Sequence, residues 1–245
     1  PDDVVPVLAC DITDDDSVAA AVAGALAQLG GLDVLVNNAG VGGPAPAEYA
    51  PGEEVRRQLE VNLLGAWRVT AAAKDALVQA RGRVVMVASR AAVLQLPIAA
   101  AYGASKRALV AYADALRLEL APAVSVSCVY PSMVRSPIHD STTQAGLSLE
   151  GVSVFEPLEG VVDAVVAACL ARVPPRDVAT SRRGGMELLL ARHLPSLVDV
   201  LVRRTVRARI AAGAFDHAAP AAGMVGRSRT SAGTGPTPPA PGASP

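Results

Sequence analysis

The chain has 245 residues, of which 51% are hydrophobic, 18% are charged and only 3% are aromatic. This composition excludes a mostly disordered protein and predicts one α/β domain, or two small domains, with an aliphatic core. The formal net charge of -1 provides no basic surface for nucleic-acid phosphates, so no nucleic-acid partner is expected.

Cysteine, histidine and hydropathy patterns indicate a soluble, cytoplasmic protein without a metal site. The cysteines are too few and too scattered for a disulfide framework or a metal-binding pair, so we expect reduced core thiols at Cys10, Cys128 and Cys169. The histidines also lack the spacing of metal ligands. No apolar stretch reaches the roughly 18 uncharged residues that a membrane span requires.

Short apolar runs alternate with helical patterns along the chain. Four buried strands are predicted at residues 4–9, 32–36, 83–89 and 124–130, and a fifth, short strand is predicted near Val178. The spacing of apolar residues predicts helices after Thr13 as N-cap and over residues 53–80, 100–120 and 158–172. Continuous apolar strands that alternate with helices are typical of an α/β fold, a Rossmann-like, doubly wound parallel sheet.

Two segments near the end of the chain differ from the rest in composition. In residues 195–211 one helical face carries arginines and another carries four apolar residues, Val198, Val202, Val206 and Ile210. Packing of this apolar face on the domain, or on a partner in a homo-oligomer, is favoured over attachment to a membrane. Gly, Pro, Ala, Ser and Thr dominate the end of the chain, which predicts a domain over residues 1–212 and a disordered tail over residues 213–245.

The clearest chemical signal is the pair formed by Tyr102 and Lys106. Residues four apart share one face of a helix, so the lysine ammonium can lie near the phenol oxygen and stabilise the phenolate. A neighbouring cation lowers the phenol pKa from about 10 toward neutral pH, which suits acid-base chemistry. An ordinary exposed helix pair is the alternative interpretation. However, the chain has only two lysines, Lys74 and Lys106, so a chance pairing of this kind is uncommon.

Three further motifs lie where a doubly wound sheet binds its ligand. Ser89 ends the strand predicted at residues 83–89, and the NNAG sequence at residues 37–40 ends the strand before it. The carboxyl ends of parallel strands form the ligand crevice, and a glycine there allows the backbone to approach a ligand. Asn62 lies within a predicted helix although Asn is a poor helix former, which indicates a specific role. Each motif alone also fits an ordinary turn or loop.

Together these motifs resemble the short-chain dehydrogenase/reductase family of the classical type. The NNAG sequence, Asn62, Ser89 and the Tyr102-x-x-x-Lys106 pair occur in the family's order and at its spacing. The resemblance covers residues 4–180. It implies hydride transfer between NAD or NADP and a small-molecule alcohol or carbonyl substrate.

The resemblance also implies a role for each catalytic-type residue. Tyr102 is the acid-base group, and Lys106 lowers its pKa and binds the nicotinamide ribose. Ser89 binds the substrate oxygen where charge develops. Asn62 holds a water molecule that links Lys106 to bulk solvent.

Cofactor contacts follow from the same resemblance. Asp11 and Ile12 lie at the adenine, and Asn38 at the adenine ribose. The other residues that the resemblance implies to contact the cofactor include Ala39, Gly40, Tyr102 and Lys106. The PSMVRS sequence at residues 131–136 matches the family's segment that meets the nicotinamide carboxamide at Val134, with Ser132 and Ser136 in place of the family's Gly and Thr.

The family's opening strand and glycine-rich TGxxxGxG turn are not found in this sequence. We therefore expect an N-terminally truncated version of the fold, in which the first two strands and helices are missing and the strand at residues 4–9 has no neighbour. Without the glycine turn, the cofactor pyrophosphate loses its backbone donors, so weak cofactor binding is expected. The alternative hypothesis is a non-catalytic fragment or scaffold that is unable to bind cofactor.

Overall fold

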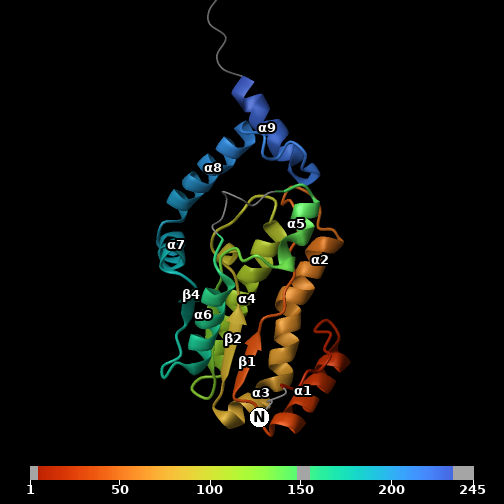
Figure 1. The fold of residues 1–245 in the computed structure, drawn as a ribbon, viewed down its shortest axis with the longest axis vertical. Helices are drawn as coiled ribbons and strands as arrows, with labels where there is room; N and C mark the ends of the chain where they lie inside the picture. Colours follow the sequence, from red (N-terminus) through yellow and green to blue (C-terminus); the bar gives the residue numbers. More distant parts are fainter. Residues whose placement is uncertain (1–4, 148–154, 234–245) are drawn as a thin grey trace, which may run out of the picture.

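A four-stranded parallel sheet forms the centre of the computed structural model, which describes residues 5–147 and 155–233 (Figure 1). The strand order is β1-β2-β3-β4, with β1 at Val34–Asn37, β2 at Arg83–Val87, β3 at Ser125–Tyr130 and β4 at Asp177–Ala179. Each strand pairs in parallel with the next strand along the chain. The predicted α/β fold with a parallel sheet is therefore confirmed.

Helices cover both faces of this sheet. Alternate residues of a strand point to opposite faces, so Val84 and Met86 pack with the helices α3 and α4, whereas Val85 packs with α6. The helices are α1 (Asp15–Leu29), α2 (Glu53–Leu59), α3 (Ala66–Ala80), α4 (Ala100–Glu119), α5 (Asp140–Gln144), α6 (Leu158–Leu170), α7 (Arg182–His193), α8 (Pro195–Ala211) and α9 (Ala222–Gly233). Short 3-10 turns lie at Arg90–Ala92, Pro137–His139 and Ala219–Ala221.

The helix predicted over residues 53–80 is interrupted by a π-helical turn. Between α2 and α3, residues Glu60–Gly65 form a π-helix, η1, which includes the buried Asn62. Such turns are rare and are frequently found at functional sites. The position of Asn62 within the helix thus coincides with a change in helix geometry.

The strand predicted at residues 4–9 is wrong for the described residues 5–9, which form no strand. Val5 and Val7 are 76% and 92% exposed. A parallel strand needs the backbone groups of a neighbour, and within the described parts of the chain β1 pairs with β2 alone. The expectation of a core thiol at Cys10 fails with this strand, because Cys10 is exposed.

The first helix also begins differently from the prediction. Its N-cap is Asp14 rather than Thr13, and the Asp14 carboxylate accepts a 2.6 Å hydrogen bond from the backbone N–H of Ser17. The hydroxyl of Thr13 instead donates to the Asp11 carboxylate at 2.7 Å. Aspartate and threonine both cap helices, so the sequence alone did not distinguish between adjacent candidates.

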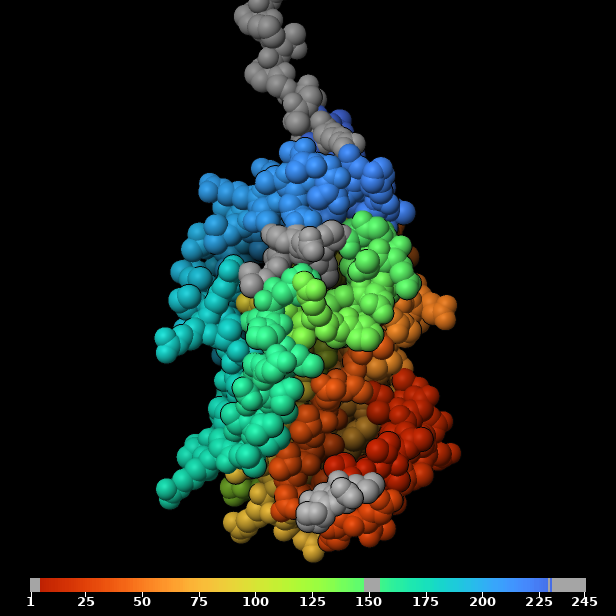
Figure 2. Space-filling view, in the orientation of Figure 1, coloured from red at the N-terminus to blue at the C-terminus, as the bar shows by residue number. Residues whose placement is uncertain are grey.

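The predicted disordered tail is wrong over residues 213–233, where the chain forms helix α9 and a small apolar cluster. Phe215, Ala218, Ala221 and Val225 are buried against Val206 and Ile210 of α8. A few apolar side chains in this segment pack together, although its Ala-rich composition is typical of a disordered tail. Figure 2 shows α8 and α9 together covering one end of the molecule. The rest of the predicted tail, residues 234–245, lies outside the described residues.

Candidate active site

Tyr102 and Lys106 lie in the first half of α4, beside the carboxyl end of β2. Lys106 is only 3% exposed, and its Nζ donates a 2.9 Å hydrogen bond to the carbonyl of Val87, the last residue of β2. The Tyr102 side chain lies near enough to that of Ser89, two residues beyond this strand, for Ser89 to influence its pKa. The expected proximity of Ser89, Tyr102 and Lys106 at the end of β2 is therefore present in the structure.

Burial sets the protonation of both groups. Loss of solvent around the Lys106 ammonium lowers its pKa from 10.5 to about 8. Burial raises the pKa of Tyr102, and the nearby Ser89 side chain opposes this rise. The expected lowering of the Tyr102 pKa by Lys106 is thus not found in the free chain, where the lysine ammonium binds the Val87 carbonyl and burial dominates.

Ser89 also caps the short turn that follows β2. Its hydroxyl oxygen accepts a 3.1 Å hydrogen bond from the backbone N–H of Ala91 and so caps the short turn at Arg90–Ala92. This contact fixes the side chain between that turn and Tyr102. The interpretation of Ser89 as a turn-starting serine and the catalytic interpretation are therefore compatible.

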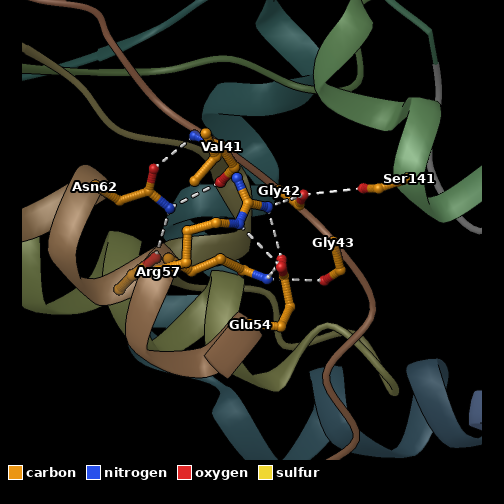
Figure 3. A network of polar contacts seen from close by, with 9 residues as sticks. Val41, Gly42, Gly43, Glu54, Arg57, Asn62 and Ser141 are labelled. Carbon is orange, nitrogen blue, oxygen red and sulfur yellow. Dashed lines mark hydrogen bonds and ion pairs between the residues drawn. The ribbon is translucent and has the colours of Figure 1, made fainter. Parts of the chain in front are cut away.

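Asn62 holds the chain that follows the NNAG sequence (Figure 3). Its Oδ1 accepts from the backbone N–H of Val41 at 2.8 Å, and its Nδ2 donates to the Val41 carbonyl at 2.9 Å. Nδ2 also donates to the hydroxyl oxygen of Ser105 on α4 at 2.9 Å. Both amide hydrogens are occupied, so a water molecule at Asn62 would have to bind the second lone pair of Oδ1 or the main chain.

Gly40 lies where Asn62 and Lys106 converge. A Cβ atom at Gly40 would lie 3.2 Å from both Lys106 Nζ and Asn62 Oδ1, closer than most side-chain contacts. The absence of a side chain leaves bare backbone beside the lysine ammonium. A side chain at this position would crowd the lysine ammonium and the Asn62 amide.

Residues without a recognisable sequence motif also hold this loop (Figure 3). Arg57 Nη2 donates to the Gly42 carbonyl at 3.3 Å, and the Ser141 hydroxyl donates to the same carbonyl at 3.0 Å. Gln58, which is fully buried, donates to the Gly43 carbonyl at 3.2 Å. The only sequence signal for them was a polar helix face, which usually indicates solvent.

The expected cofactor residues occupy several places around the sheet edge. Asn38 and Ala39 are exposed directly after β1, and the half-buried Val134 follows β3. Asp11 is exposed in the loop before α1, where it accepts a 2.9 Å hydrogen bond from the backbone N–H of Thr13, and Ile12 packs against Gly65 at the end of η1. The strand-end residues thus share one edge with Tyr102, whereas Asp11 lies next to α1.

A nearly buried carboxylate connects the segment after β3 to the segment after Ser89. Glu156 accepts from the Ser132 backbone N–H at 3.1 Å and from the Ser181 hydroxyl at 2.6 Å, and it also accepts from Thr180. Arg90 Nη2 lies 3.8 Å from Glu156 Oε1. Burial alone would raise the Glu156 pKa, but the donors at Ser181, Thr180 and Ser132 and the Arg90 charge together hold it below its usual value.

We expect Glu156→Gln to lower the free energy of unfolding at neutral pH by about 3 kcal/mol, because Arg90 loses one counter-charge within a buried pair. The folded-state pKa of Glu156 is lowered, so its contribution is present at neutral pH and disappears as the pH falls through that pKa. Urea unfolding at pH 7 and in acid measures both effects. The control is Glu159→Gln, at an exposed carboxylate on α6. Equal stability of Glu156→Gln and the unmodified chain at pH 7 would contradict this account.

Comparison with known proteins shows the family of the chain. The family model described as short chain dehydrogenase matches residues 3–146, more than half of the chain. The chain belongs to the short chain dehydrogenase family. An uncharacterized oxidoreductase of Myxococcus xanthus, a member of similar sequence, is 38% identical over 130 residues, which are 52% of this chain and 51% of the relative.

Two further similar proteins carry more specific names. The NADPH-dependent 1-acyldihydroxyacetone phosphate reductase of Schizosaccharomyces pombe is 34% identical over 160 residues, 63% of this chain and 54% of the relative. A crystal structure of a short chain dehydrogenase from Burkholderia cenocepacia in complex with NADP has a TM-score of 0.68 and 26% identity, and the match covers 82% of this chain and 81% of that one. The chain spans about half the length of these curated relatives.

Proposed function

We propose that this member of the short chain dehydrogenase family transfers a hydride between NAD or NADP and an alcohol or carbonyl substrate, with Tyr102 as the acid-base group. The proximity of Tyr102 to Ser89 at the end of β2, with Lys106 buried one helical turn away and bonded to the Val87 carbonyl, is the observation that carries the proposal. The complex of the Burkholderia cenocepacia relative with NADP and the NADPH dependence of the yeast reductase support the cofactor class. A nicotinamide nucleotide, when bound, supplies or accepts the hydride.

The side chains around the end of β2 have different roles in the proposed reaction. The Tyr102 phenol is protonated at neutral pH and burial raises its pKa further, so this hydroxyl can donate its proton to an oxygen that gains negative charge. Ser89, which already contacts Tyr102, can bind the same oxygen. The positive charge of Lys106 stabilises the phenolate that remains after proton donation. The protonated phenol is the form that acts as the acid in the reductive direction.

Residues near Gly40 fit the nicotinamide end of a cofactor. Gly40 lies beside Lys106 Nζ without a side chain, and Asn62 holds the adjoining Val41 on both of its backbone groups. Lys106 is proposed to bind the hydroxyls of the nicotinamide ribose. Asn38 after β1 is proposed to contact the adenine ribose, with Ala39 beside it, and Val134 after β3 is proposed to contact the carboxamide. Asp11 and Ile12 are proposed to lie at the adenine.

The test is an assay of nicotinamide absorbance at 340 nm with NADPH and NADH and a panel of ketones that includes 3-oxoacyl thioesters. It is made on the 245-residue chain and on a version extended upstream through a glycine-rich turn. We expect the extended version to reduce at least one substrate class and the 245-residue chain to bind NADPH weakly in isothermal titration. Failure of the extended version to bind or oxidise either nucleotide would favour the alternative, a non-catalytic scaffold.

A further inference from the structure

Helices α7 and α8 expose a cluster of large apolar side chains. Seven of them are at least 38% exposed, and together we call them the leucine face: Met186, Leu189, Leu190, Leu194, Leu197, Val200 and Leu201. Leu194 lies between the two helices, which contact each other, so the cluster continues from one helix to the next. Soluble monomers rarely expose this much apolar surface in one place unless it binds something.

The leucine face differs from the apolar face that the sequence pattern of α8 selects. Val206 and Ile210, on the opposite side of α8, are 8% and 5% exposed and pack on the chain around Phe215. At about 100° per residue, Leu197 and Leu201 point away from this packed side. The selected face thus packs on the domain as expected, while a second apolar face on the same helix is left open to solvent.

Positive charge surrounds the leucine face. Helices α7 and α8 carry only two acidic residues, Glu187 and Asp199, against seven arginines, namely Arg182, Arg183, Arg192, Arg203, Arg204, Arg207 and Arg209. Glu187 already pairs with Arg90 and Arg183. Among the described residues, Arg203, Arg204 and Arg207 form no ion pair, so their charges face solvent.

Two of these arginines border a hollow beside α8. The hollow has a volume of about 360 Å³, and its lining includes Val202, Val206 and Ile210 together with Arg203, Arg207 and Arg227, of which Arg227 pairs with Glu48. An apolar lining beside guanidinium groups matches a molecule that has an acyl chain and an anionic head.

We propose that α7 and α8 dock on an anionic lipid surface, with the leucine face inserted at the boundary between headgroups and acyl chains. Arg203, Arg204 and Arg207 then lie at the level of the headgroup phosphates. Basic helices with one apolar face bind membranes in this way, through buried apolar area together with attraction to anionic lipids. In the parts of the chain that the structure describes, no helix is long and apolar enough to cross a membrane. The proposed contact is therefore with the surface of the bilayer.

The same charges argue against a second copy of the chain as the occupant. A two-fold interface on the leucine face would bring Arg204 and its neighbours against the identical arginines of the partner copy. Like charges that meet in this way oppose association. An anionic lipid surface presents the complementary charge over the whole patch.

The experiment is co-sedimentation of the 245-residue chain with vesicles of phosphatidylcholine alone or with 30% phosphatidylserine. We expect binding to the anionic vesicles that weakens at high salt, and much less binding to the neutral ones. Leu197→Glu combined with Leu201→Glu should weaken vesicle binding at least about tenfold, and Arg204→Glu by about fivefold or more. The matched control is Leu118→Glu, on α4, where the leucine is 81% exposed. Circular dichroism verifies that each variant is folded.

Three outcomes would overturn the proposal. They are absence of binding to anionic vesicles, equal binding by the doubly substituted variant, and a dimer seen by analytical ultracentrifugation that the same two substitutions abolish. The third result would assign the leucine face to a second copy. None of these outcomes bears on the proposed chemistry at Tyr102, because no residue of the leucine face belongs to that site.

Discussion

Replacement of Tyr102 by phenylalanine is expected to reduce turnover of the extended version between about 10²- and 10⁴-fold, the range that a positioned proton donor contributes. The ring remains to fill its place beside Ser89, and only the hydroxyl is lost. Cofactor affinity should therefore stay nearly constant, so the loss appears in kcat rather than in nucleotide binding.

Steady-state assays combined with isothermal titration of NADPH separate these two quantities. Tyr49→Phe is the control, since it removes a phenol hydroxyl from a side chain that is 58% exposed. A Tyr102→Phe variant that retains most of its turnover would show that another group supplies the proton, and it would remove the main support for the proposed mechanism.

Lys106→Met is expected to reduce turnover and, at the same time, to increase the stability of the folded chain. Turnover should fall at least about 10²-fold, because the phenolate loses its stabilising charge. Stability at pH 7 should increase, because a buried ammonium whose pKa falls from 10.5 to about 8 costs on the order of 3 kcal/mol. The lost hydrogen bond from Nζ to the Val87 carbonyl offsets about 1 kcal/mol of this gain. We expect a net increase of about 2 kcal/mol in the free energy of unfolding.

The pH dependence of this difference has a definite sign. The folded chain releases the Lys106 proton near pH 8, whereas the unfolded chain keeps it up to its ordinary pKa of 10.5. Between these values the unfolded state binds more protons, so the stability of the unmodified chain rises with pH. The advantage of Lys106→Met should therefore shrink across this window. Urea unfolding at pH 7 and pH 10 measures it, with Lys74→Met, at the exposed lysine of α3, as the control.

Local sequence rules predicted the elements that carry the site. The i, i+4 spacing of Tyr102 and Lys106 and the Val-rich run that ends at Ser89 are local signals, and the structure brings these residues together at the end of β2. Residues 5–9 show where such rules fail. Their apolar run is typical of a strand, yet a strand forms only beside a partner, and no local pattern reports whether that partner is present.

Contacts between residues far apart in the sequence also explain the other differences between prediction and structure. Phe215 and Val225 order residues that composition assigns to a tail, because α8 provides a surface for them. The roles of Arg57, Gln58 and Ser141 depend on a loop that folds back over α2, which spacing within a helix does not reveal. Asn62 was singled out by its poor helix propensity, while its partner Val41 became apparent only from the fold.

The π-helical turn at Glu60–Gly65 has a consequence for the alignment of the two helices that it joins. One extra residue in a helix rotates everything beyond it by about 100°. Gln58, before the turn, faces Gly43, and Leu77, after it, is fully buried in the core. A deletion of one residue within the turn would restore a regular α-helix but would rotate one half against the other. Either the contact of Gln58 with Gly43 or the core packing of α3 would then be lost. The extra residue in the turn therefore keeps both helices oriented toward their partners.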